Sequence, residues 1–110
     1  MTTLSTHVLD TMHGRPAAGM QLWLNGPDGE ALFAGETNTD GRCPGLPDLA
    51  PGFRYALVFA VAEYFAAAGV ALPDPPFLGN VQIAFGVADG GHYHVPLLVS
   101  PFAYSTYRGS

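Results

Sequence analysis

The sequence contains no lysine, and only 12% of its 110 residues carry a charge. Its four cations are all arginines, and nine acidic residues bring the formal net charge to -5. Nucleic acids and acidic membrane surfaces attract proteins through positive charge, so we expect neither as a partner. So few charges on the surface also favour self-association.

Cysteine is nearly absent too, because Cys43 is the only one. A single cysteine excludes an internal disulfide, which favours a reducing compartment and predicts a cytoplasmic protein. We expect Cys43 to be a small buried hydrophobic residue rather than a nucleophile. No apolar run reaches the roughly 20 residues of a transmembrane helix, and residues 1–10 are too polar for a signal peptide.

What the chain does have is apolar sequence in short pieces separated by turns. Hydrophobic residues make up 48% of it, and its length suits one domain over residues 1–110. Residues 61–68 have helical spacing and are stopped by Gly69. The other segments alternate with a period of two, which predicts an all-β antiparallel sandwich of about eight strands with one short α-helix. The clearest strands are expected at 4–10, 19–24, 31–34, 54–60 and 80–87.

The end of the sequence, residues 92–110, reads HYHVPLLVSPFAYSTYRGS. In an extended backbone His92 and His94 lie on the same face, because successive side chains alternate. The run 95–99 contains Pro96, which favours a strand with an open edge or a bulge. Residues 102–107 predict a second strand after a turn. The last four residues are either an ordinary solvated terminus or a segment held in place.

Four side chains suit the hydrolysis of a cyclic amide or ureide, which needs a base for water and donors for an oxyanion. Histidine titrates near neutral pH, and arginine offers a charged planar fork. The candidates are His7, Arg42, His94 and Arg108. Taken singly, a strand histidine or a turn arginine is more often a surface or structural residue.

The terminal stretch resembles the C-terminal signature of the 5-hydroxyisourate hydrolases, the transthyretin-related enzymes of purine breakdown. Their hallmark is a terminal Tyr-Arg-Gly-Ser, which stands here at 107–110. Other segments are similar to the family's markers in the same order, namely 4–10 (LSTHVLD), 15–17 (RPA), 39–42 (TDGR) and 64–65 (YF). The resemblance implies a transthyretin-like sandwich of two four-stranded sheets with one helix. It also implies a homotetramer with active sites in a channel between dimers.

The same resemblance implies the site residues and the reaction. The reaction is hydrolysis of 5-hydroxyisourate to 2-oxo-4-hydroxy-4-carboxy-5-ureidoimidazoline in urate degradation, with no cofactor and no metal. A histidine, His7 or His94, activates water, and an arginine binds the substrate. The catalytic set is His7, Arg42, His94 and Ser110; substrate binding falls to His7, Arg42, Tyr107 and Arg108; His92 and Gly109 support them.

Two alternatives come from other classes of protein. The first is a carrier like transthyretin, which uses the same channel to bind a small ligand without chemistry. The second is a metalloprotein, because His92, His94 and His7 supply three imidazoles, the number found in some catalytic zinc sites. A His-x-His pair is a weak signal for a metal.

Overall fold

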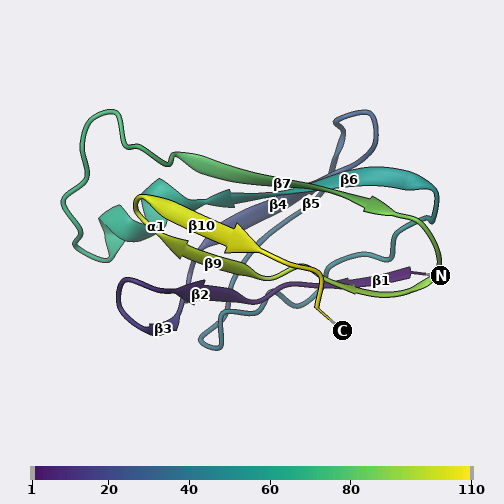
Figure 1. Cartoon of the computed structure of the whole chain (residues 1–110), viewed down its shortest axis with the longest axis horizontal. Coiled ribbons are helices and arrows are strands. Elements are labelled where there is room, and N and C mark those ends of the chain that lie inside the picture. Colours follow the sequence, from purple (N-terminus) through teal and green to yellow (C-terminus); the bar gives the residue numbers. More distant parts are fainter. Residues whose placement is uncertain (1, 110) are drawn as a thin grey trace.

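The computed structural model describes residues 2–109, in which ten strands and one helix form two facing layers (Figure 1). The predicted helix and the predicted strands at 54–60 and 80–87 are confirmed to within one residue. The elements in chain order are β1 (Thr2–Ser5), β2 (Val8–Asp10), β3 (Arg15–Pro16), β4 (Gln21–Asn25), β5 (Ala31–Glu36), β6 (Phe53–Ala60), α1 (Val61–Ala67), β7 (Asn80–Val87), β8 (Gly91–His94), β9 (Leu97–Ser100) and β10 (Ala103–Thr106).

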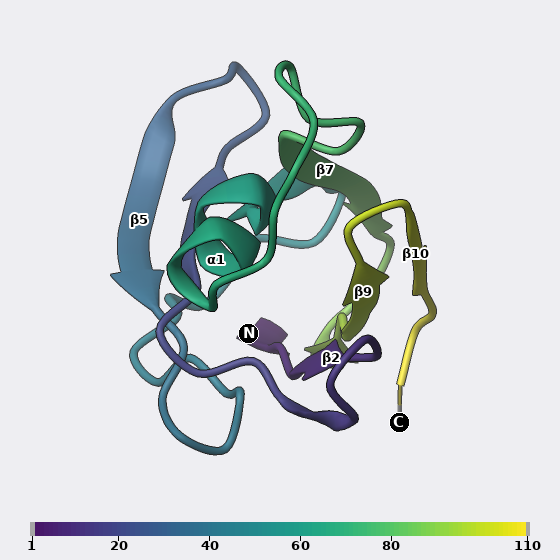
Figure 2. The ribbon, with the colours of Figure 1, turned by 90° about the vertical axis from the view of Figure 1, so that its left-hand side faces the viewer.

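One layer is an antiparallel sheet in the order β5-β4-β6-β7. The other is the sheet β10-β9-β2-β3, continued along the molecule by the pair β1-β8. Seen along the long axis, β5 lies on one side and β9 and β10 lie on the other, with α1 at the near end (Figure 2). This is the two-layer sandwich that the alternating segments predicted.

The second layer differs from the prediction in one respect, since two of its strand pairs are parallel. β1 pairs with β8, and β2 pairs with β9, in the parallel sense. Short turns between neighbouring segments indicate antiparallel hairpins, as at β4-β5 and β9-β10. They carry no information about the pairing of the first strand with the last ones, because the whole domain lies between them.

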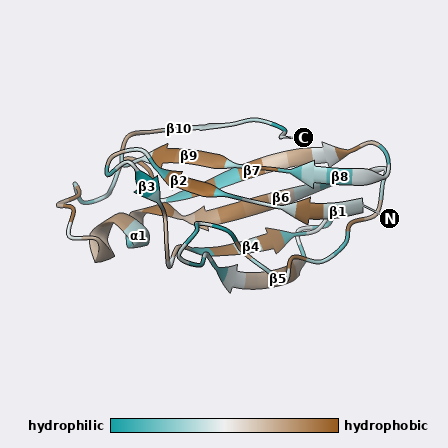
Figure 3. Ribbon diagram, turned by 90° about the horizontal axis from the view of Figure 1, so that it is seen from below, coloured by the Kyte–Doolittle hydropathy of each residue, from teal (hydrophilic) through white to brown (hydrophobic). Residues whose placement is uncertain are grey.

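The core lies between the two layers, where the hydrophobic segments of β2, β4, β6 and β9 face inward (Figure 3). The predicted strand at 19–24 alternates as expected: Met20, just before β4, and Leu22 and Leu24 within it are buried, with exposures of 0%, 1% and 0%. Helix α1 covers one end of the core with Val61, Tyr64 and Phe65. It stops before Gly69, whose φ of 87° suits glycine and few other residues.

The first predicted strand, residues 4–10, is divided into β1 and β2 by a break at Thr6 and His7. The alternation of faces continues through the break, because Leu4, Thr6 and Val8 are buried while His7 is half-buried. The Thr6 hydroxyl donates to the Val95 carbonyl at 2.7 Å, so its burial leaves no unpaired polar group. His7 therefore lies on the face opposite to Leu4, Thr6 and Val8, as the alternation of an extended strand requires.

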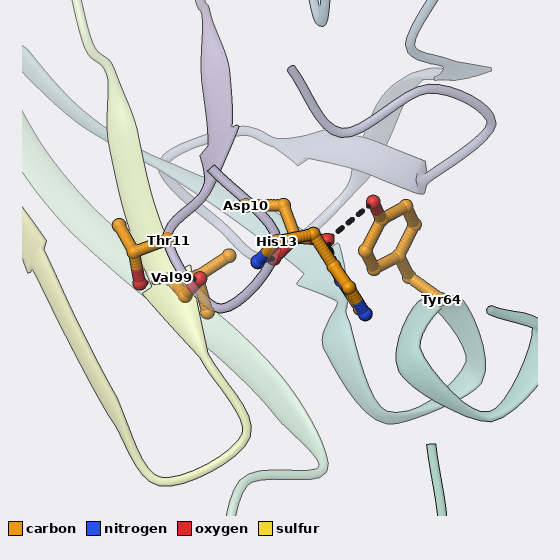
Figure 4. A network of polar contacts seen from close by, with 5 residues as sticks. All are labelled: Asp10, Thr11, His13, Tyr64 and Val99. Carbon is orange, nitrogen blue, oxygen red and sulfur yellow. Dashed lines mark hydrogen bonds and ion pairs between the residues drawn. The ribbon is translucent and has the colours of Figure 1, made fainter. Parts of the chain in front are cut away.

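A buried carboxylate fixes the end of β2 (Figure 4). Asp10 has no exposed surface, and it accepts hydrogen bonds from the backbone N–H of His13 (2.9 Å), the His13 ring (2.6 Å) and the Tyr64 hydroxyl (2.8 Å). Burial raises the pKa of Asp10, but these bonds from His13 and Tyr64 outweigh it and hold the pKa below its ordinary value. The network ties β2 to helix α1 three residues beyond His7.

Within residues 2–109, no helix is long and apolar enough to cross a membrane.

Candidate active site

Strand β8 presents its two histidines on the outer face of the sheet. A single hydroxyl, Oγ of Ser5 on β1, lies 2.8 Å from Nε2 of His92 and 2.7 Å from Nδ1 of His94. Tyr93, between them, points the other way and is buried. The shared face predicted for His92 and His94 is confirmed, and β1 supplies the group that joins them.

Arg42 is brought next to His7 by the tight turn that precedes it. The two residues form an isolated antiparallel bridge, and the Gly41 carbonyl accepts from the Val8 N–H at 2.8 Å. Gly41 has a φ of 77°, and a Cβ there would lie within 2.4 Å of the Val8 carbonyl oxygen. Only glycine allows so close an approach. The Asn38 side chain accepts from the Arg42 N–H at 3.1 Å and holds the exposed arginine in place.

His94 is the residue of this group whose pKa the neighbouring side chains change. Its pKa is lowered from the ordinary 6.5, first by partial burial and then by the charges of Arg42, His7 and His92. All three of these residues were predicted to belong to the site, and they act on the same imidazole. A lowered pKa keeps the ring neutral, which is the state that a general base requires.

The C-terminal segment lies along the open edge of β8. The Gly109 N–H donates to the His94 carbonyl at 2.8 Å, and a Cβ on Gly109 would lie 2.5 Å from Cδ2 of the His94 ring. Tyr107 is 59% exposed. Ser110 lies outside the described residues. The contacts of Gly109 fit a terminal segment that is held in place rather than an ordinary solvated terminus.

Arg108 points to the opposite side of β8 from the histidines. Its guanidinium carbon lies 3.9 Å from the centre of the Tyr93 ring, and Nη2 donates a long bond of 3.5 Å to the His92 carbonyl. Tyr93 is itself fixed, because its hydroxyl accepts from the Ala88 N–H at 3.1 Å and donates to Asp89 at 3.2 Å. In this conformation the arginine holds the segment onto β8.

Sequence reasoning missed the hydroxyl residues of β1. Thr3 Oγ1 lies 2.6 Å from Nδ1 of His92, and Ser5 joins the two histidines. The signal was present in the alternation, since residues 3, 5 and 7 share one face of an extended chain. His13 and Cys43 take no part in the site: His13 belongs to the Asp10 network, and Cys43 is buried, which raises the pKa of its thiol.

Two cavities of the described structure lie away from the histidines. A cavity of about 720 Å³ between α1 and β3 is lined by Arg15, Glu63 and Tyr64 among others, and one of about 140 Å³ lies beside Tyr93, Tyr107 and Arg108. Neither includes His7, Arg42, His92 or His94.

The imidazoles are not arranged as a metal site. Over the described part of the chain, no three His, Cys, Asp or Glu side chains are grouped so that they could hold a metal ion.

A family model described as the HIUase/Transthyretin family matches residues 4–109. The chain belongs to this family. It is 51% identical to a 5-hydroxyisourate hydrolase of Mesorhizobium japonicum, over 97% of this chain and 91% of the relative. The family resemblance of the terminal signature is confirmed.

Solved structures of family members have the same fold. The 5-hydroxyisourate hydrolase of Klebsiella pneumoniae matches with a TM-score of 0.85 at 38% identity, over 100% of both chains. Sea bream transthyretin in complex with thyroxine matches with a TM-score of 0.85 at 27% identity, over 96% of this chain and 93% of that one. An (S)-allantoin synthase matches with a TM-score of 0.89 at 41% identity, and this chain, covered to 99%, spans 44% of that longer protein. The predicted transthyretin-like fold is confirmed.

Proposed function

We propose that this protein hydrolyses 5-hydroxyisourate to 2-oxo-4-hydroxy-4-carboxy-5-ureidoimidazoline in urate degradation. The observation that carries the proposal is the grouping around His94, where the charges of His7 and Arg42 act on its ring and Gly109 packs against it. The name of the Mesorhizobium relative, half of whose residues are identical, points to the same reaction.

The reaction adds water across a cyclic amide. A neutral imidazole, from His7 or His94, takes a proton from water as the water oxygen bonds to the carbonyl carbon. Arg42 donates hydrogen bonds to the oxyanion that develops on the carbonyl oxygen. When the tetrahedral intermediate collapses, the ring C–N bond breaks, and the imidazolium returns its proton to the leaving nitrogen. The products are a carboxylate and a free amide nitrogen, and no cofactor is consumed.

The remaining site residues act in support. His92 supports His94 through Ser5, and Gly109 holds the terminal segment against the His94 ring. Tyr107 and Arg108 are proposed to bind the substrate, for which Arg108 has to leave the Tyr93 ring and turn to the histidine side, and Ser110 is proposed to contribute its hydroxyl to catalysis. These roles rest on the family resemblance together with the position of the segment beside His94.

We also propose that the protein works as a homotetramer. The hairpin β9-β10 exposes Phe102, Tyr104 and Tyr107, with exposures of 60%, 47% and 59%. Exposed aromatic clusters near an unpaired strand edge favour association, and few charges oppose it. A second copy over this hairpin would bury these aromatic side chains. Sedimentation that finds only monomer at micromolar concentration would contradict the assembly.

The test of function is direct. 5-Hydroxyisourate is generated from urate, and the loss of its ultraviolet absorbance is followed with and without the protein. We expect acceleration over spontaneous decay by the wild type, and loss of most of it in His94→Ala and in Arg42→Ala. An identical decay with and without protein would overturn the proposal. Tight binding of a thyroxine-like ligand in the same preparation would then favour the carrier, in line with the fold shared with sea bream transthyretin.

A further inference from the structure

Three hydrogen bonds connect four side chains of β1 and β8 into one chain. Thr3 Oγ1 lies 2.6 Å from His92 Nδ1, and Ser5 Oγ lies 2.8 Å from His92 Nε2 and 2.7 Å from His94 Nδ1. Among residues 2–109, both nitrogens of His92 are engaged, and His94 is bound through Nδ1 alone. Within these residues the chain of hydrogen bonds therefore ends at His94, and Nε2 is the ring nitrogen that remains for chemistry.

Counting protons restricts this chain of hydrogen bonds to three arrangements when both rings are neutral. A neutral imidazole has one N–H and one lone pair, and the Ser5 hydroxyl has one proton to donate and two lone pairs that accept. In the first arrangement His94 Nδ1–H donates to Ser5, Ser5 donates to His92 Nε2, and His92 Nδ1–H donates to Thr3. In the second arrangement every bond runs the other way. In the third, both rings donate to Ser5, and Thr3 donates to His92 Nδ1. The first and third leave a lone pair on His94 Nε2, and the second leaves an N–H there.

We propose that Thr3 and Ser5 are positioning residues that hold His94 in the tautomer with its proton on Nδ1, so that Nε2 of His94 is the base of the reaction. This inference rests on the proposed function and names which histidine activates water. Partial burial and the charge of Arg42 favour the neutral form of His94, and two of the three arrangements of the neutral rings place its lone pair on Nε2.

The chain of hydrogen bonds stabilises His94 when it takes up a proton during the reaction. As Nε2 takes a proton from water, His94 becomes an imidazolium, and its Nδ1–H bond to Ser5 strengthens because the donor is now charged. The proton leaves again from Nε2 to the departing nitrogen, so Ser5, His92 and Thr3 end the cycle as they began. Ser5 thus plays the part that an orienting group plays for a catalytic histidine.

The test compares Ser5→Ala with Ser5→Thr, which keeps the hydroxyl. The matched control is Ser100→Ala, because Ser100 lies at the end of β9 and its hydroxyl bonds only within the β9-β10 turn. We expect Ser5→Ala to lower kcat by at least about tenfold with little change in KM, which is less than the ~10⁴-fold cost of a wrong tautomer in a serine protease. Ser5→Thr should recover most of the rate, and Ser100→Ala should match the wild type.

A spectroscopic measurement decides the tautomer independently of activity. Nitrogen-15 NMR of the histidine rings in the wild type should show His94 protonated on Nδ1 and bare on Nε2 when it is neutral. A proton on Nε2, or a Ser5→Ala variant as fast as the wild type, would overturn the inference while leaving the hydrolase function intact. A wild type that does not hydrolyse 5-hydroxyisourate would overturn the proposed function, and the ring spectrum would still report the tautomer.

Discussion

Gly109 offers the sharpest probe of whether the C-terminal segment belongs to the active site. A methyl group placed on it would lie 2.5 Å from Cδ2 of His94, and 3.1 Å from both Cβ and Cγ of the same side chain. Ordinary contacts between carbon atoms are about 3.5–4.0 Å. Gly109→Ala must therefore move the His94 ring or lift the segment off β8 by roughly 1 Å.

Whether the ring moves or the segment lifts, we expect a large fall in the reaction rate and a small fall in the free energy of unfolding. Lifting the segment costs one peripheral backbone hydrogen bond, the 2.8 Å bond from Gly109 to His94. Such a bond contributes about 0.5–1.5 kcal/mol to the free energy of unfolding. A displacement of ~1 Å at a reacting group can slow a reaction by about 100-fold. We expect turnover of 5-hydroxyisourate to fall at least about tenfold, which is ~1.4 kcal/mol in the barrier.

The matched control is Gly79→Ala. A Cβ on Gly79 would meet nothing within 4 Å, and Gly79 has no positive φ, so the same chemical change should leave rate and unfolding nearly unaltered. Initial rates and urea denaturation are measured on both variants. A folded Gly109→Ala protein with the turnover of the wild type would show that the segment beside His94 has no part in catalysis.

Three further predictions use the same assays. The rate should fall as pH drops through the pKa of His94, below the ordinary 6.5, and Arg42→Met should move this acid limb of the residual rate to higher pH because a cation is lost. Asp10→Asn should lower the free energy of unfolding by about 2 kcal/mol at neutral pH. The loss should shrink in acid, since Asp10, with its lowered pKa, contributes stability above its ordinary 3.8 that disappears as pH falls through the folded value. Deleting residues 107–110 should slow turnover at least about tenfold and change the melting temperature much less.

Much of the outer face could be predicted, because the alternation of polar and apolar residues in a strand shows which side chains share a face. His92 and His94 share a face, and His7 faces outward, for the same reason: successive side chains of extended backbone alternate. The turn before Arg42 could also be predicted, because glycine is typical of turns. In the structure its glycine, Gly41, adopts a φ of 77°. Their assignment to one catalytic site came from the family resemblance and stays a prediction.

The sequence could not indicate which strands pair across the domain. The parallel pairing of β1 with β8 sets Ser5 opposite His94 and Thr3 opposite His92, which produces the hydrogen-bond chain between them. Nothing local specifies this register, because β1 and β8 are separated by most of the chain. The break at Thr6 and His7 is likewise a result of non-local contacts, above all the bond from Thr6 to the Val95 carbonyl.

The position of the terminal segment follows from the two faces of β8. Its outward residues, His92 and His94, make the site, and its inward residue, Tyr93, carries Arg108 on its ring. Because Gly109 pairs with His94 in an antiparallel bridge, Arg108 must fall on the Tyr93 side and Gly109 on the histidine side. A glycine is needed on the histidine side to let the segment approach the ring, and a long cation suits the other side, where an aromatic face is available. The order Arg-Gly in the tetrapeptide is thus the order that the alternation of β8 requires.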